Sequence, residues 1–345
     1  MRFPPFASRA HLEDLFNTGL RAMLDAHDEL GTHILVLANA VQDAALWHDL
    51  RVALEESHTR HAERAGAALR NGRAPTAAAD DVTVFLKLMA IGFSHLAPVE
   101  SRRVPADPMQ ALPDWELQFN PLRALRPERM SRERVEGIAR PFDARGFHFN
   151  KPFLDQEVLW RGELAGKPAR LLYNKFPFAP LHGLLVPEPE LERPQLLTPE
   201  MHDWAWCVAG AAANAIAGFG LAYNSYGAFA SVNHLHFQSF VRDAPLPAQA
   251  GATAYPLAAQ RHRDTREAWF HLDALHRAGT AYNLIYDGDG LLLIPRARQG
   301  EVVLEAWSGG FGWSEMAGVF AVTCRDDFAT LDGPTLRAAL ARWAV

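Results

Sequence analysis

The segment His234-Leu235-His236-Phe237-Gln238 constrains the fold and the chemistry of this chain more than any other. Polar and apolar residues alternate in it, and Phe240 and Val241 extend the apolar run. Side chains of a β-strand alternate between faces, so a strand here would place His234, His236 and Gln238 on one face. Two imidazoles and a neutral amide suit chemistry on a phosphate, because one imidazole can attack, the second can orient and the amide can hold an oxygen.

The same pattern has two other interpretations, a purely structural pair of histidines and a metal site. A metal site needs a third ligand, and Asp243 is separated from the row by Phe240-Val241-Arg242. The two cysteines, Cys207 and Cys324, form no CxxC motif. We therefore predict that the row holds no metal.

Composition limits the class of protein. The 345 residues suffice for one large domain or two small ones, with 49% hydrophobic and 21% charged residues. A formal net charge of −6 argues against a surface that coats nucleic acid. No apolar stretch reaches ~18 residues, and Met1–Phe6 lacks the apolar segment of a signal peptide. We expect a cytoplasmic protein with no membrane or nucleic-acid partner, and no expectation about oligomeric state follows.

Periodicity predicts a helical N-terminal region over residues 1–105. Apolar residues recur at helical spacing from 9 to 72, with a break at Leu30-Gly31, and a further helix is predicted over 82–96. Residues 105–134 are rich in proline and arginine, which predicts irregular structure around one strand at 115–120.

Strand patterns dominate from residue 106 onward, which we predict to form one domain, 106–345. A second, degenerate half of it, about 255–345, partly repeats the layout without any HxHxQ. The predicted fold is therefore α+β: an antiparallel sheet with packed helices, in two degenerate halves, plus the helical N-terminal region. The expected strands are 157–161, 169–173, 183–187, 281–286 and 291–295, and the expected helices are 199–219, 257–276 and 333–343.

Two segments carry a family resemblance. Residues 174–187 (NKFPFAPLHGLLVP) resemble the strand–loop–strand of the histidine-triad superfamily, and HxHxQ in place of HxHxH resembles its nucleotidyl-transferring branch. The run 223–238 (YNSYGAFASVNHLHFQ), with 117–120, 140–143 and 147–151, is most similar to the GDP-L-galactose and GDP-D-glucose phosphorylases. The resemblance covers about 115–245, and residues 1–105 match no family known to us.

The resemblance implies a mechanism. His236 would attack a nucleoside diphosphate sugar and form a nucleotidyl-histidine, His234 would orient the phosphates, and inorganic phosphate would complete a conversion of GDP-hexose to GDP and hexose 1-phosphate. Gln238 cannot titrate, so it can hold a phosphate oxygen without assisting water. No cofactor is required, although Mg²⁺ can accompany the nucleotide.

The remaining candidates would bind the nucleotide and its phosphates. Small residues let backbone amides approach phosphate oxygens, and each of these positions is also compatible with an ordinary turn, core or surface role. The candidates are Asn174, Lys175, Asn224, Ser225, Gly227, Ser231, Lys151 and His182.

Three alternative functions stay open: a dinucleoside polyphosphate phosphorylase of the diadenosine tetraphosphate type, a histidine-triad hydrolase, and a non-catalytic nucleotide sensor. A hydrolase would form product without phosphate, and a sensor would bind nucleotide without turnover.

Overall fold

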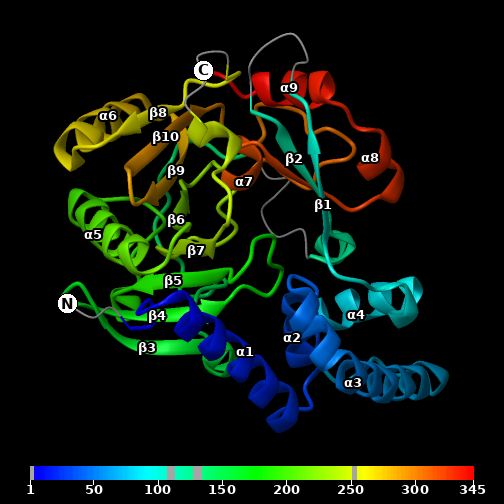
Figure 1. The fold of residues 1–345 in the computed structure, drawn as a ribbon. Helices are drawn as coiled ribbons and strands as arrows, with labels where there is room; N and C mark the ends of the chain where they lie inside the picture. The colour runs from blue at the N-terminus through cyan, green and yellow to red at the C-terminus, as the bar shows by residue number, and fades with distance from the viewer. Residues whose placement is uncertain (1–3, 107–112, 127–133, 251–254) are drawn as a thin grey trace.

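The computed structural model describes residues 4–106, 113–126, 134–250 and 255–345, and Figure 1 shows their arrangement. Parts of the predicted irregular stretch 105–134, namely 107–112 and 127–133, lie outside the described residues, as does 1–3. Among the described residues no helix is long and apolar enough to cross a membrane.

The larger of the two sheets has eight strands and occupies the left half of the view in Figure 1. Every pairing in it is antiparallel, which confirms the predicted fold class. The β3–β4 turn consists of Ala165 and Gly166, both with positive φ, as a tight two-residue hairpin requires. In spatial order the strands are β3 (Val158–Leu164), β4 (Lys167–Tyr173), β5 (Gly183–Pro187), β7 (Phe237–Val241), β6 (Phe219–Asn224), β9 (Ala281–Asp287), β10 (Gly290–Arg296) and β8 (Gln260–His262).

The sheet contains one topological unit twice. The order β5-α5-β6-β7 places β7 between β5 and β6, and the order β8-α6-β9-β10 places β10 between β9 and β8. The two units meet where β6 pairs with β9, with Asn224 opposite Asn283. The helices are α5 (Pro199–Ala215) and α6 (Thr265–Ala278).

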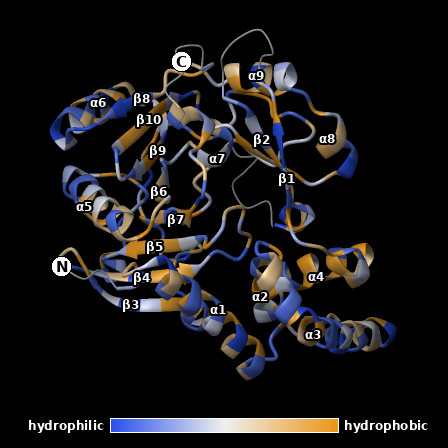
Figure 2. Ribbon diagram, viewed as in Figure 1, coloured by the Kyte–Doolittle hydropathy of each residue, from blue (hydrophilic) through white to orange (hydrophobic). Residues whose placement is uncertain are grey.

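Each face of the sheet is covered by a different layer. Helices α5 and α6 pack on one face, where Leu221, Phe237 and Leu284 belong to a single core. The opposite face, which includes Ala222, Phe240 and Leu292, packs against the C-terminal elements. Figure 2 shows β5 and β10 coloured as hydrophobic along most of their length, as expected for strands buried on both faces.

The C-terminal elements surround a three-stranded sheet of order β1-β2-β11, in which β11 pairs in parallel with β2. Gly318 has φ +92, and a Cβ there would lie 2.7 Å from Pro247, so the turn into β11 requires glycine. The elements are β1 (Glu100–Val104), β2 (Trp115–Phe119), α7 (Trp313–Met316), β11 (Val319–Val322), α8 (Arg325–Thr330) and α9 (Gly333–Ala341).

The N-terminal region is helical up to Ile91, as predicted, and its helices share one core. The last residues of the predicted helical range 1–105 instead form strand β1, which pairs with β2. Ser8 and Asp43 cap α1 and α3 with their side-chain oxygens. Tyr173 of β4 donates to the Phe16 carbonyl at 2.8 Å, which joins α1 to the sheet. The helices are α1 (Arg9–Ala26), α2 (Leu30–Ala40), α3 (Ala44–Arg70) and α4 (Ala79–Ile91). The division into domains at residue 105 stays a prediction.

Several sequence predictions were wrong in detail. Strand β7 begins only at Phe237, so His234 and His236 precede the strand and Gln238 alone lies on it. The predicted helix 257–276 begins at Thr265, because Asp264 caps it and residues 260–262 pair with β10. The predicted helix 199–219 ends at Ala215, and Phe219 begins β6.

Candidate active site

A cavity of about 170 Å³ opens beside β4, β5 and β7. It combines aromatic walls with cationic and amide groups, the composition expected of a site for a nucleotide. Six of the predicted site residues line it: His236, Gln238, Asn174, Lys175, Asn224 and Ser231.

His236 is buried and held in one tautomer. Its Nδ1 donates to the His234 carbonyl at 2.8 Å, which leaves Nε2 as the ring nitrogen available to the cavity. Burial lowers the pKa of His236 to about 4, although the bond to the His234 carbonyl acts in the opposite direction. The imidazole is therefore neutral near pH 7, the form in which Nε2 carries a nucleophilic lone pair.

Gln238 is oriented by two donors. Its Oε1 accepts from Trp313 Nε1 at 2.9 Å and from His182 Nε2 at 3.0 Å. The tautomer of His182 is set by Phe178, whose backbone N–H donates to His182 Nδ1 at 3.3 Å. With Oε1 occupied, the side-chain NH₂ of Gln238 is the group left to donate to an oxygen in the cavity.

His182 therefore supports Gln238 from behind. It is fully buried and does not line the cavity, although it was a candidate for contact with the nucleotide. Burial lowers the pKa of His182 to about 3, and the bond to Gln238 opposes this. The ring stays neutral, so it can donate to Gln238 without adding charge.

His234 also lies outside the cavity lining. Its Nδ1 accepts from the Phe149 backbone N–H at 3.2 Å, and its ring stacks on Phe149 at a centroid separation of 5.6 Å. Burial, with smaller contributions from His236 and His148, lowers its pKa to about 4. The backbone carbonyl of His234 orients His236, and its side chain fixes the segment around Phe149.

Some of residues 224–231 line the cavity, and others hold the surrounding backbone in place. Asn224 Oδ1 accepts from the Trp313 N–H at 3.0 Å and from Asn283 Nδ2 at 2.7 Å, which leaves its own amide N–H groups for the cavity. Ser225 Oγ instead accepts from the Tyr282 N–H at 3.0 Å, away from the cavity. Gly227 does not line the cavity. It has a φ of +87, and its carbonyl accepts a hydrogen bond from the Gln299 N–H at 2.7 Å.

The cationic groups are distributed differently from the prediction. Lys175 lines the cavity and bonds Asp81 of α4 at 2.7 Å. Lys151 lies outside it and donates to the Ala144 carbonyl at 3.0 Å. Arg123 and Arg126, which sequence reasoning missed, line the cavity instead. They fall in the stretch predicted to be irregular, where nothing distinguished them from the other arginines.

Glu315 is the acidic neighbour of these arginines. It lines the cavity and accepts from the Gly312 N–H at 3.0 Å. Burial raises the pKa of Glu315, while Arg123 and Arg126 act to lower it. Within the part of the chain that the structure describes, no three histidine, cysteine or acidic side chains converge in the cavity as metal ligands would.

Gln195 is a further residue that sequence reasoning did not identify. Its Oε1 accepts from the His236 N–H at 2.9 Å, and its Nε2 donates to the carbonyls of Asn224 and His236 at 2.9 and 3.2 Å. Gln195 lies 41 positions from His236 in the sequence and its side chain bonds to backbone groups, so no local sequence pattern predicts its role. Gln195 holds the end of β6 and the residue before β7 at a fixed separation.

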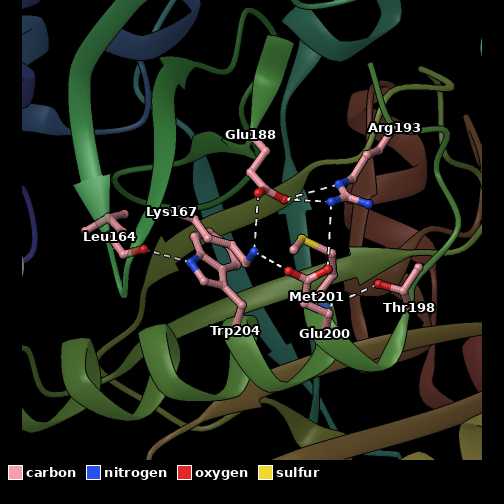
Figure 3. Close-up of polar contacts among 8 residues, drawn as sticks. All are labelled: Leu164, Lys167, Glu188, Arg193, Thr198, Glu200, Met201 and Trp204. Carbon is pink, nitrogen blue, oxygen red and sulfur yellow. Dashed lines mark hydrogen bonds and ion pairs between the residues drawn. The ribbon is translucent and has the colours of Figure 1, made fainter. Parts of the chain in front are cut away.

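An ionic network holds the segment that carries Gln195 (Figure 3). Lys167 of β4 bonds Glu188 at 3.3 Å and also bonds Glu200 of α5. Arg193 bonds Glu188 at 3.0 Å and its carbonyl accepts from the Leu235 N–H at 2.8 Å. The connection between β5 and α5 is thereby tied to the strand, to the helix and to the histidine segment.

Known proteins are similar to this chain in sequence and in fold. Residues 114–240 match the family described as GDPGP1-like, N-terminal domain. GDP-D-glucose phosphorylase 1 of Danio rerio is 35% identical over 116 residues, 33% of this chain and 32% of that protein. GDP-L-galactose phosphorylase 1 of Arabidopsis thaliana is 32% identical over 155 residues, 39% of this chain and 34% of that protein. The match thus spans about a third of the length of these relatives.

The fold itself has a solved counterpart. A crystal structure of the yeast Ap4A phosphorylase superposes with a TM-score of 0.52 at 17% identity, over 76% of this chain and 94% of that one. At this identity the likeness concerns the fold alone. The resemblance predicted from residues 115–245 is therefore confirmed: the segment that carries His236 and Gln238 is similar to the GDP-hexose phosphorylases, on a fold shared with the Ap4A phosphorylase.

Proposed function

We propose that this chain is a nucleotidyltransferase that converts GDP-hexose and inorganic phosphate to GDP and hexose 1-phosphate. The observation that carries the proposal is the neutral His236 imidazole, whose Nδ1–H is bonded to a carbonyl and whose Nε2 faces a cavity lined by Arg123, Arg126 and Lys175. The similarity of residues 114–240 to enzymes named for this reaction supports the choice of substrate class.

The reaction divides into two displacements. His236 Nε2 forms a bond to the α-phosphorus, and the bond from that phosphorus to the bridging oxygen breaks, so hexose 1-phosphate leaves with the electron pair. The resulting imidazolium keeps its Nδ1–H on the His234 carbonyl. A phosphate oxygen then attacks the same phosphorus and releases neutral His236 and GDP, so no proton has to enter the ring.

The groups around His236 suit this chemistry. The NH₂ groups of Gln238 and Asn224 can donate to phosphate oxygens, and the three cations offset the diphosphate charge. Gln238 offers water neither an acid nor a base, which favours transfer to phosphate over hydrolysis. Mg²⁺ can accompany the nucleotide, but no step is assigned to it.

Cys207 and Cys324 are both free and exposed, which fits a reducing compartment. We accordingly propose that the reaction takes place in the cytoplasm.

The test is a ping-pong assay with GDP-hexose labelled in its α-phosphate, with phosphate omitted and then added. We expect a labelled, acid-labile adduct on wild type that phosphate discharges as GDP. His236→Asn should form no adduct, whereas His148→Asn, a buried histidine outside the cavity lining, should still form it.

A nucleotide panel run in parallel identifies the alternatives. Preferred release of ADP from a dinucleoside polyphosphate would replace the GDP-hexose assignment with the diadenosine tetraphosphate type. Product formed at the same rate without phosphate would indicate a hydrolase, and tight nucleotide binding with no adduct would indicate a sensor.

A further inference from the structure

Three side chains of metal-ligand type converge in the second half of the sheet, away from the cavity. They are His262 of β8 and Glu267 and His271 of α6, and their ligand atoms all lie within 4.8 Å of one another. Among the described residues this is the one group of three or more histidine, cysteine or acidic side chains that converges in this way.

The local fold brings the three residues together. Glu267 and His271 are four positions apart on α6, so they project from the same helix face. His262 is held by its register opposite Leu291, and only Arg263 and Asp264 separate β8 from the helix. Asp264 caps α6 by accepting from the Glu267 N–H at 2.9 Å, which fixes the first turn of the helix against the strand.

His262 supplies a second, independent observation. Its side chain is only 4% exposed, and neither ring nitrogen has a hydrogen-bond partner. The nearest carboxylate oxygen, Glu267 Oε1, is 3.5 Å from His262 Nδ1. Buried polar atoms without partners are costly, so a cation bound to either ring nitrogen of His262 would relieve that cost.

The spacing suits a shared cation better than direct hydrogen bonds. Zn–N and Zn–O bonds of about 2.0–2.2 Å place neighbouring ligand atoms of a tetrahedral site about 3.4 Å apart. The 3.5 Å separation of His262 Nδ1 from Glu267 Oε1 is close to that value. The rings of His262 and His271 have centroids 4.8 Å apart, so small side-chain rotations suffice to aim both at one ion.

We propose that His262, Glu267 and His271 bind Zn²⁺ or a cation of similar ligand preference, with water at the fourth position. Two imidazoles and one carboxylate suit Zn²⁺ and are poor ligands for Mg²⁺ or Ca²⁺, which prefer oxygen alone. The ion joins the edge strand β8 to α6 and so stabilises the second half. This site is separate from the HxHxQ row, where the Nδ1 atoms of both histidines already have hydrogen-bond partners.

The test uses the full chain without an affinity tag, stripped with EDTA and titrated with Zn²⁺ alone. Bound metal is measured by mass spectrometry after gel filtration, and thermal unfolding is followed with Zn²⁺ and with EDTA. We expect one Zn²⁺ per chain, and at a free concentration 100 times Kd an unfolded-to-folded ratio about 100-fold lower than in EDTA. Co²⁺ in place of Zn²⁺ should give the visible absorption of a tetrahedral site.

Variants locate the ion. His271→Ala and Glu267→Gln should each weaken binding by at least about 100-fold and lose the difference between Zn²⁺ and EDTA. His48→Ala, an exposed histidine of α3, is the matched control and should bind as wild type does. Binding that survives in both ligand variants, that disappears in His236→Asn, or that is absent from wild type would overturn the proposal.

Discussion

The two halves of the eight-stranded sheet share a topology but differ in their connections. In the first half, residues 188–198 join β5 to α5 and residues 225–236 join β6 to β7. In the second half the corresponding connections are only 263–264 and 288–289. The long connections carry Gln195, Ser231 and His236, whereas the short ones leave no chain to build a cavity. The long connections therefore place His236 and the residue that holds its backbone, whereas the strands β6 and β7 add Asn224 and Gln238 to the same cavity.

Strands β7 and β10, which hold the same place in the two halves, also differ in their side chains. Strand β7 carries Gln238 on the face that packs with Ala222, while the same face of β10 carries Leu292 and Ile294. Leu292 is 2% exposed and Ile294 is fully buried, so β10 contributes to the core where β7 contributes to the cavity. Substitutions on the two strands should therefore separate activity from stability.

The largest effect is expected from His236→Asn in the first half. Removal of the proposed nucleophile should lower kcat/KM for phosphorolysis by about 10⁴-fold or more, as loss of a covalent catalyst does. Steady-state kinetics with GDP-hexose and phosphate measure it, and circular dichroism checks that the variant is folded. Activity within 10-fold of wild type would show that the cavity histidine is not the nucleophile.

Leu292→Ala in the second half should lower stability and leave activity nearly unchanged. Loss of a buried leucine side chain should lower the free energy of unfolding by about 2–5 kcal/mol, since a cavity remains. Urea titration measures the change, and the kcat of the folded fraction should stay within about threefold of wild type. A large loss of kcat at full folding would mean that the second half takes part in the chemistry.

Gln195→Ala tests whether the long β5–α5 connection positions His236. It leaves the buried His236 N–H and two carbonyls without their partner, which should cost about 1–3 kcal/mol of stability. We expect kcat to fall by about 10- to 100-fold with a smaller change in KM, because orientation rather than binding is lost. Gln195→Glu, which retains the acceptor for the His236 N–H but not the donors, should recover part of the rate.

The smallest expected effect is in the pH dependence of stability. The folded pKa of His236 is about 4 against 6.5 for an unperturbed imidazole, so the unfolded chain protonates first as pH falls. The stabilisation from His236 is complete above pH 6.5 and is lost as pH falls towards 4. Between pH 6.5 and 5, wild type should lose about 2 kcal/mol more than His236→Asn. Leu292→Ala should keep the wild-type slope, and equal slopes for all three would contradict the low pKa.

Sequence reasoning predicted the local patterns and missed the long-range ones. The β9–β10 hairpin and Gln238 were found because alternation and turn residues are visible within a few positions. Strand β6 was missed because the small and apolar residues before Phe219 continue the pattern of α5 without interruption. Arg123 and Trp313 were not predicted, because only the three-dimensional fold places Arg123 in the same cavity as His236 and Trp313 in contact with Gln238.

The ion pair between Lys175 and Asp81 has a consequence for how this protein can be divided. Lys175 belongs to the segment shared with the phosphorylases, whereas Asp81 belongs to α4, outside that segment. A fragment cut at the limits of the shared segment would expose Lys175 without its counter-ion and the Tyr173 hydroxyl without the Phe16 carbonyl. The electrostatic potential of the cavity is thus a property of the whole chain, and a transplant of residues 114–240 into another scaffold would carry His236 without the native charge balance of its cavity.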